Sequence, residues 1–180
     1  MKKLNLTNNN ELFSNDLEYY GGKYSFTESL KINGTGSTKL IYKNGISEIE
    51  NSITSKGNDF IFINLELLKN GLLLRINLNQ KIKCFGLRLD EIEELNLTAF
   101  KVQIRVKKFG IYVTKIVHRG ELEIKTSTSS IRLIILVKDF KSFSKYLNKP
   151  KLKEKLKYVV SNNEPEKDES YIMEIIDFFI

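Results

Sequence analysis

From residue 60 to residue 137, apolar and polar positions mostly alternate with a period of two, the spacing of a half-buried β-strand. Turn-forming residues separate the runs, and no long helical pattern interrupts them. The expected strands are 60–68, 72–78, 82–89, 101–108, 111–117, 121–126 and 131–137. This order predicts a mainly β protein built on a bent antiparallel sheet or half-open barrel.

Two Asn-Gly pairs predict tight hairpins, because a type I′ turn needs positive φ at both central residues. Asn70-Gly71 would join strands 60–68 and 72–78. Asn44-Gly45 would join a strand at 40–43 to a returning strand at 46–53. A further strand is expected at 24–32, and another turn at His118-Arg119-Gly120.

The period changes after residue 137, where apolar positions fall at helical spacing. The residues that carry this stripe are Phe140, Phe143, Tyr146 and Leu147. Asp139 is the expected N-cap, and Pro150 ends the helix. We expect this helix to cover the open side of the sheet, and a second short helix at 151–160 to follow it.

The chain divides by pattern into four parts. Residues 1–18 are polar and Asn-rich and are expected to form a flexible or loosely docked leader. An N-terminal β extension at 19–58 precedes the main domain with its C-terminal helices at 59–160. A charged linker and an apolar terminal segment occupy 161–180. The length of 180 residues suits one domain with extensions.

Composition narrows the class of protein. With 41% hydrophobic and 28% charged residues, the chain has the balance of a soluble globular protein. Its one cysteine, Cys84, rules out an intramolecular disulfide. No apolar core of a signal peptide follows the N-terminal lysines, and no run reaches the roughly 18 to 20 apolar residues of a membrane span. The expected location is the cytoplasm.

A row of basic residues on strand 101–108 is the candidate anion-binding surface. It comprises Lys101, Arg105, Lys107 and Lys108. With the lysines of the C-terminal helices and a formal charge of +7, this row would attract phosphates. The alternative is an ordinary solvent-facing surface balanced by Glu121, Glu123 and the acids at 90–94. Nucleic acid is a disfavoured partner, because no aromatic residues alternate with the row to stack on bases.

Catalytic and metal-binding patterns are weak throughout. His118 is the only histidine, and Cys84 lies in an apolar strand far from it in sequence. The element Gly34-Thr35-Gly36 lacks the lysine and the strand-to-helix context of a phosphate loop. We therefore expect no catalytic residues, no metal, no cofactor and no enzymatic activity.

The apolar ending of the chain is the candidate partner-binding segment. Ile172, Ile175, Ile176 and Phe179 would line one face of a terminal helix. This face would either fold back onto its own domain or dock on a partner as a helix in a groove. Docking on a second copy would make the protein a homo-oligomer.

Residues 60–147 resemble the pleckstrin-homology-like superfold. The pieces that carry the resemblance are GLLLRINL (71–78), LRLDEIEELNL (87–97) and GELEIKT…IRLIILVKDFKSFSKYL (120–147). The middle piece is similar to the segment of bacterial members in which a strand leads into a short, acidic, isoleucine-containing strand. The chain departs from vertebrate-type members in having no tryptophan in the closing helix, and residues 1–58 lie outside the resemblance.

The resemblance implies a bent antiparallel sheet closed by one C-terminal helix, and a binding module rather than an enzyme. Phosphoinositide-binding members place basic residues around their first hairpin, but the matching segment 68–76 holds only Lys69 and Arg75. The predicted function is therefore a non-enzymatic cytoplasmic interaction module for a protein or peptide. The alternative is a peripheral binder of anionic lipid surfaces through lysine-rich faces.

Overall fold

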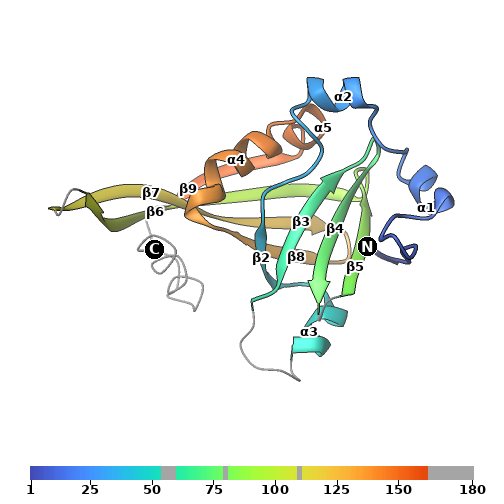
Figure 1. Cartoon of the computed structure of the whole chain (residues 1–180), viewed down its shortest axis with the longest axis horizontal. Helices are drawn as coiled ribbons and strands as arrows, with labels where there is room; N and C mark the ends of the chain where they lie inside the picture. The colour runs from blue at the N-terminus through green and yellow to red at the C-terminus, as the bar shows by residue number, and fades with distance from the viewer. Residues whose placement is uncertain (54–59, 79–80, 109–110, 162–180) are drawn as a thin grey trace.

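The computed structural model describes residues 1–53, 60–78, 81–108 and 111–161, with the backbone alone at 52–53, 104–108 and 111–112 (Figure 1). The strands are β1 (Lys2–Leu4), β2 (Leu40–Asn44), β3 (Phe62–Leu67), β4 (Gly71–Leu78), β5 (Lys81–Arg88), β6 (Ile92–Lys108), β7 (Ile111–Thr126), β8 (Ser130–Ile135) and β9 (Leu156–Ser161). The helices are α1 (Ser14–Tyr19), α2 (Phe26–Lys31), α3 (Ser47–Ile53), α4 (Val137–Leu147) and α5 (Pro150–Lys153). The expected mainly β class with a C-terminal helix is confirmed.

The described strands form one open sheet in the order β1-β5-β4-β3-β2-β8-β7-β6-β9. Two three-strand meanders, β3-β4-β5 and β6-β7-β8, lie on either side of β2. Every pairing is antiparallel except β6 with β9. Residues 89–91 alone join β5 to β6, a link that spans no more than roughly 14 Å. The sheet must therefore curve strongly to bring these two strands together (Figure 1).

The main hydrophobic core contains residues of β2 to β8 and of α4. Phe143, Tyr146 and Leu147 of α4 are buried in it, as the helical spacing predicted. The predicted N-cap is wrong: Leu136 occupies that position without a side-chain cap, and Asp139 lies in the first turn.

The N-terminal leader is docked rather than loose. β1 pairs with β5, from Lys2 opposite Gly86 to Leu4 opposite Cys84. Leu4 and Leu12 are buried in a second cluster with Leu68, Leu73, Tyr20 and Cys84. Apolar residues on the outer face of β4 and β5 need this cover, because leaving them in water costs free energy. Strands β1 and β2 of the N-terminal part therefore belong to the same sheet as the later strands.

The hairpin between β3 and β4 is confirmed, with Leu67 opposite Leu72. The expected type I′ turn at Asn70-Gly71 is wrong, because neither residue has a positive φ and the amide of Leu68 donates to the carbonyl of Gly71 instead. The Asn44-Gly45 hairpin is wrong, because the chain enters α3 and β2 pairs with β3 and β8 instead. The hydroxyl of Tyr42 accepts a hydrogen bond from the amide of Ile46 at 2.5 Å. The carboxylate of Glu50 accepts one from the amide of Gly45 at 2.7 Å. These side chains satisfy amides that a returning strand would otherwise have paired.

Three further expectations differ from the structure. The expected strand at 24–32 contains α2, which begins with a capping box between Ser25 and Glu28. No turn interrupts β7 at 118–120, because these residues stay in register with β6. The predicted helix at 151–160 is only α5, followed by β9, because a short helix is marginal in water and residues 156–161 pair with β6 instead. No helix in the described part of the chain is long and apolar enough to cross a membrane.

Candidate functional site

The distal parts of β6 and β7 form a two-stranded arm that extends beyond the sheet (Figure 1). β9 pairs with β6 only from Leu95 to Phe100, and β8 pairs with β7 only from Gly120 to Lys125. Residues 101–108 and 111–118 therefore pair only with each other among the described strands. We call these two stretches the hairpin arm.

The predicted anion-binding row lies on the hairpin arm. Lys101 is exposed and pairs with His118. Positions 105 and 107 pair with Thr114 and Tyr112. By the alternation of a strand, positions 101, 105 and 107 share one face and position 108 belongs to the other. Of the predicted row, the positions of Lys101, Arg105 and Lys107 therefore share one face of the strand. The position of Lys108 is on the opposite face.

The hairpin arm exposes apolar side chains on both faces. Ile116, opposite Gln103, is 65% exposed, and Val113, opposite Val106, is 42% exposed. These two pairs belong to alternate faces of the ribbon. At its root the arm contacts α4, since the ring of His118 stacks on Phe140 with centroids 5.8 Å apart. An isolated two-stranded ribbon is marginally stable in water, so a surface of this kind gains from a partner.

Strand β9 is the second exposed surface. One edge of β9 pairs with β6, and the other pairs with no described strand. Tyr158, Val159 and Val160 are 52%, 58% and 45% exposed. Ser161 pairs with Phe100, the residue directly before the arm. The open edge of β9 and the hairpin arm are therefore one continuous surface.

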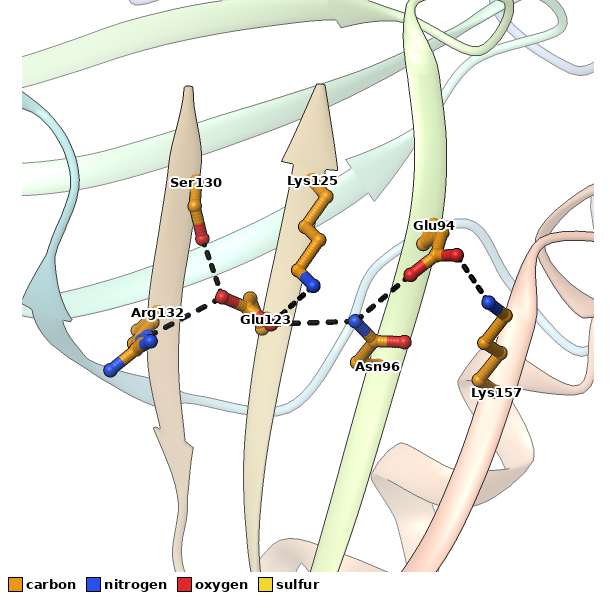
Figure 2. Close-up of polar contacts among 7 residues, drawn as sticks. All are labelled: Glu94, Asn96, Glu123, Lys125, Ser130, Arg132 and Lys157. Atoms are coloured by element: carbon orange, nitrogen blue, oxygen red, sulfur yellow. Dashed lines mark hydrogen bonds and ion pairs between the residues drawn. The ribbon is translucent and has the colours of Figure 1, made fainter. Parts of the chain in front are cut away.

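A row of hydrogen bonds and ion pairs crosses one face of β9, β6, β7 and β8 (Figure 2). We call this row the polar ladder. Asn96 donates to both Glu94 and Glu123, at 3.3 Å in each case. Ser130 donates to Glu123 at 2.8 Å. Three cations complete the ladder: Lys157 at Glu94, and Lys125 and Arg132 at Glu123.

Both carboxylates of the ladder are paired with cations. The hydrogen bond from Lys157 holds the pKa of Glu94 below its ordinary value. Burial raises the pKa of Glu123, but hydrogen bonds from Ser130 and Asn96 and the nearby cations outweigh it, so the pKa of Glu123 is lowered. Both carboxylates are thus charged and paired at neutral pH, and Lys157 links β9 to the sheet. The ladder is better suited to holding β9 in place than to binding an anion.

Cys84 and His118 do not form a nucleophile pair. Cys84 is buried with Leu4 and Tyr20, and burial raises the pKa of its thiol to about 11. His118 instead stacks on Phe140. No group of three or more His, Cys, Asp or Glu side chains in the described ranges could hold a metal ion.

The predicted partner-binding residues Ile172, Ile175, Ile176 and Phe179 lie outside the described residues. The exposed edge was missed because 151–160 was interpreted as a helix. The run Tyr158-Val159-Val160 was the available signal, since aromatic and β-branched residues favour strands. No protein-family model, curated protein or solved structure matches this chain.

Proposed function

We propose that this protein is a non-enzymatic cytoplasmic interaction module that binds a protein or peptide partner through the open edge of β9 and the hairpin arm. The observation that carries the proposal is the continuity of these two surfaces at the pair Phe100 and Ser161. An edge strand presents backbone N–H and C=O groups to which an extended peptide can add as a further strand. The exposed Tyr158, Val159 and Val160 would supply side-chain contacts to that strand.

The charge of the arm indicates an acidic partner. Between residues 101 and 118 there are five basic residues and no aspartate or glutamate: Lys101, Arg105, Lys107, Lys108 and Lys115. Complementary charge speeds encounter and excludes partners of like charge more than it adds affinity. An acidic protein segment that pairs with β9 would be attracted electrostatically to the basic hairpin arm.

Attachment to an anionic lipid surface is the second candidate. The same basic residues and the exposed Val113 and Ile116 would suit lipid headgroups and the upper acyl region. Hydrocarbon cannot satisfy the hydrogen bonds of an open strand edge. We therefore place the protein partner first and treat lipid binding as the alternative outcome of the test.

We also propose that the finer fold class is pleckstrin-homology-like. Strands β2 to β8 form a curved, open antiparallel sheet, and α4 follows them directly and packs on the core. Because β2 lies in the middle of the sheet, such a unit would begin before residue 59. β1 and β9 would then be additions at its two edges. The binding role implied by this class supports an interaction module.

The test compares partner capture by the full chain and by two variants, with each recovered protein quantified and sequenced. Val159→Lys places a charge on the β9 edge. Phe26→Lys is the matched control, because Phe26 is 79% exposed on α2, away from this surface. We expect an acidic protein that is recovered by the full chain and by Phe26→Lys, and at least tenfold less by Val159→Lys. Equal recovery by all three proteins would refute the role of this surface.

The lipid alternative is tested in parallel by co-sedimentation with neutral and anionic vesicles at low and high salt. Binding to anionic vesicles alone, lost at high salt and in Lys101→Glu, would favour the lipid surface because salt screens exposed charges. Deleting residues 170–180 in both assays tests the terminal segment separately. Loss of capture in the deletion but not in Val159→Lys would move the partner site to Ile172, Ile175, Ile176 and Phe179.

A further inference from the structure

A polar pocket of about 510 Å³ lies between the loop that precedes β2 and the C-terminal part of α4. Six of its lining residues carry a cationic or hydroxyl group: Ser37, Thr38, Ser142, Lys145, Tyr146 and Lys149. No aspartate or glutamate of the described residues lines it. The volume lies within the range of roughly 300–1,000 Å³ that is typical of small-molecule sites.

Backbone hydrogen bonds hold one wall of the pocket in place. The amide of Ser37 donates to the carbonyl of Leu65 at 2.8 Å. The amide of Leu67 donates to the carbonyl of Thr35 at 2.8 Å. The hydroxyl of Ser37 also accepts from the amide of Leu65 at 2.8 Å. The loop is thus fixed to β3, and the pocket is formed before any ligand enters.

Lys149 is a buried cation in this pocket. It is 6% exposed, and its ammonium group donates to the carbonyl oxygen of Gly34 at 2.6 Å. The same group lies 4.5 Å from the ring centroid of Tyr146. No carboxylate of the described residues forms an ion pair with it. Burial lowers the pKa of Lys149. A carbonyl and a ring satisfy the ammonium in part, but neither neutralises its charge.

Two residues that line the pocket carry buried hydroxyl groups without a partner among the described residues. The hydroxyl oxygens of Tyr146 and Thr38 are buried, and neither has a hydrogen-bond partner in the described part of the chain. Tyr146 is only 4% exposed. Buried hydroxyls are nearly always hydrogen-bonded in folded proteins. Both hydroxyl oxygens are closed to solvent, so they stabilise no ligand in the open pocket directly, and the positive charge of the two lysines is what the pocket offers.

We propose that this pocket binds the phosphate group of a phosphomonoester, with Lys149 and Lys145 supplying positive charge and polar residues lining the remaining walls. A phosphomonoester carries about −1.5 to −2 charges at neutral pH and three strong acceptor oxygens. Two lysines match that charge better than they match the single charge of a carboxylate. The remaining volume accommodates the group that bears the phosphate. The site is separate from the hairpin arm and does not depend on the proposed partner.

The test is isothermal titration calorimetry of the full chain with inorganic phosphate and glycerol 3-phosphate at low ionic strength, with glycerol as the neutral probe. Lys149→Gln removes the buried charge. Lys141→Gln removes an exposed charge from α4 outside the pocket, and is the matched control. We expect both phosphates to bind the parent and Lys141→Gln alike, Lys149→Gln to weaken binding at least tenfold, and glycerol not to bind.

Lys145→Gln keeps the test decisive if Lys149→Gln fails to fold, as judged by circular dichroism. This variant is expected to weaken binding at least threefold. Vesicles containing phosphatidic acid identify the source of the group. Binding to them that glycerol 3-phosphate displaces indicates a lipid headgroup, whereas binding of the soluble ester alone indicates a metabolite. No phosphate binding by the parent, or equal weakening by Lys141→Gln and Lys149→Gln, overturns the proposal.

Discussion

Tyr20 lies against the backbone of Gly86 so closely that a Cβ at position 86 would stand 2.3 Å from the tyrosine hydroxyl oxygen. At Gly71 the corresponding distance, to Cδ1 of the same ring, would be 2.5 Å. Tyr20 is only 1% exposed, and burial, with Glu91 nearby, raises its pKa to about 12. Two glycines on adjacent strands thus make room for one side chain of the N-terminal segment.

The docking of this segment is tested at Leu4. Leu4 is 4% exposed in the same cluster as Tyr20, so Leu4→Ala leaves a cavity and should lower the free energy of unfolding by about 2–5 kcal/mol. Phe13 is 50% exposed, and Phe13→Ala is the control, with an expected change of about 0.5 kcal/mol or less. Urea denaturation measures both. Equally small losses for the two variants would mean that the segment is not docked.

Gly45 is the residue on which the turn from β2 into α3 depends. Its φ is +107°, and a Cβ there would lie 2.1 Å from the carbonyl oxygen of Ser130. Because this atom belongs to the backbone of β8, Gly45→Ala should cost about 2–5 kcal/mol of stability from strain and overpacking together.

Gly22 provides the matched control for Gly45. Its φ is +80°, and a Cβ at this position would meet no other atom within 4 Å, so Gly22→Ala tests backbone strain without a clash. The expected cost is about 1–2 kcal/mol. Thermal and urea unfolding of both variants give the comparison. A Gly45→Ala variant no less stable than Gly22→Ala would contradict the close approach of the Gly45 backbone to β8.

Glu28 should make stability depend on pH in acid. Its carboxylate accepts from the amide of Ser25 at 2.7 Å and pairs with Lys69 at 3.2 Å. The backbone hydrogen bond from Ser25, with smaller contributions from its hydroxyl and from Lys69, lowers the pKa of Glu28 from 4.5 to about 2. Because the pKa is lower in the folded state, the stabilisation is complete above pH 4.5 and is lost as the pH falls towards 2.

Glu28→Gln should therefore be less stable than the parent at pH 7, and the difference should shrink steadily as the pH approaches 2. Urea denaturation between pH 2 and pH 7 measures it. Glu18→Gln removes the same charge from α1 and serves as the control. A difference between Glu28→Gln and the parent that stays constant with pH would show that the carboxylate charge does not stabilise α2.

Local pattern predicted those elements whose stability depends on near neighbours in the chain. Strand β3 alternates in burial with a period of two, a hairpin joins it to β4, and the stripe of α4 faces the core. The capping box of α2, serine at position 25 and glutamate three residues later, was present in the sequence, but 24–32 was predicted as a strand. The helical stripe and the alternating strands together were enough to predict a mainly β sheet with a C-terminal helix.

For the candidate sites too, some features followed from the sequence and others only from the tertiary structure. The sequence alone determined that residues 101–118 would be a basic, apolar hairpin without acids. Only the tertiary structure decided that this hairpin leaves the sheet, that 156–161 lies beside it as an edge strand, and that β2 inserts between β3 and β8. It also brought Lys149 to Gly34 across 115 residues. The physical reason is that strand partners and burial depend on which distant surfaces are available to cover apolar groups, whereas periodicity records only the neighbours within one element.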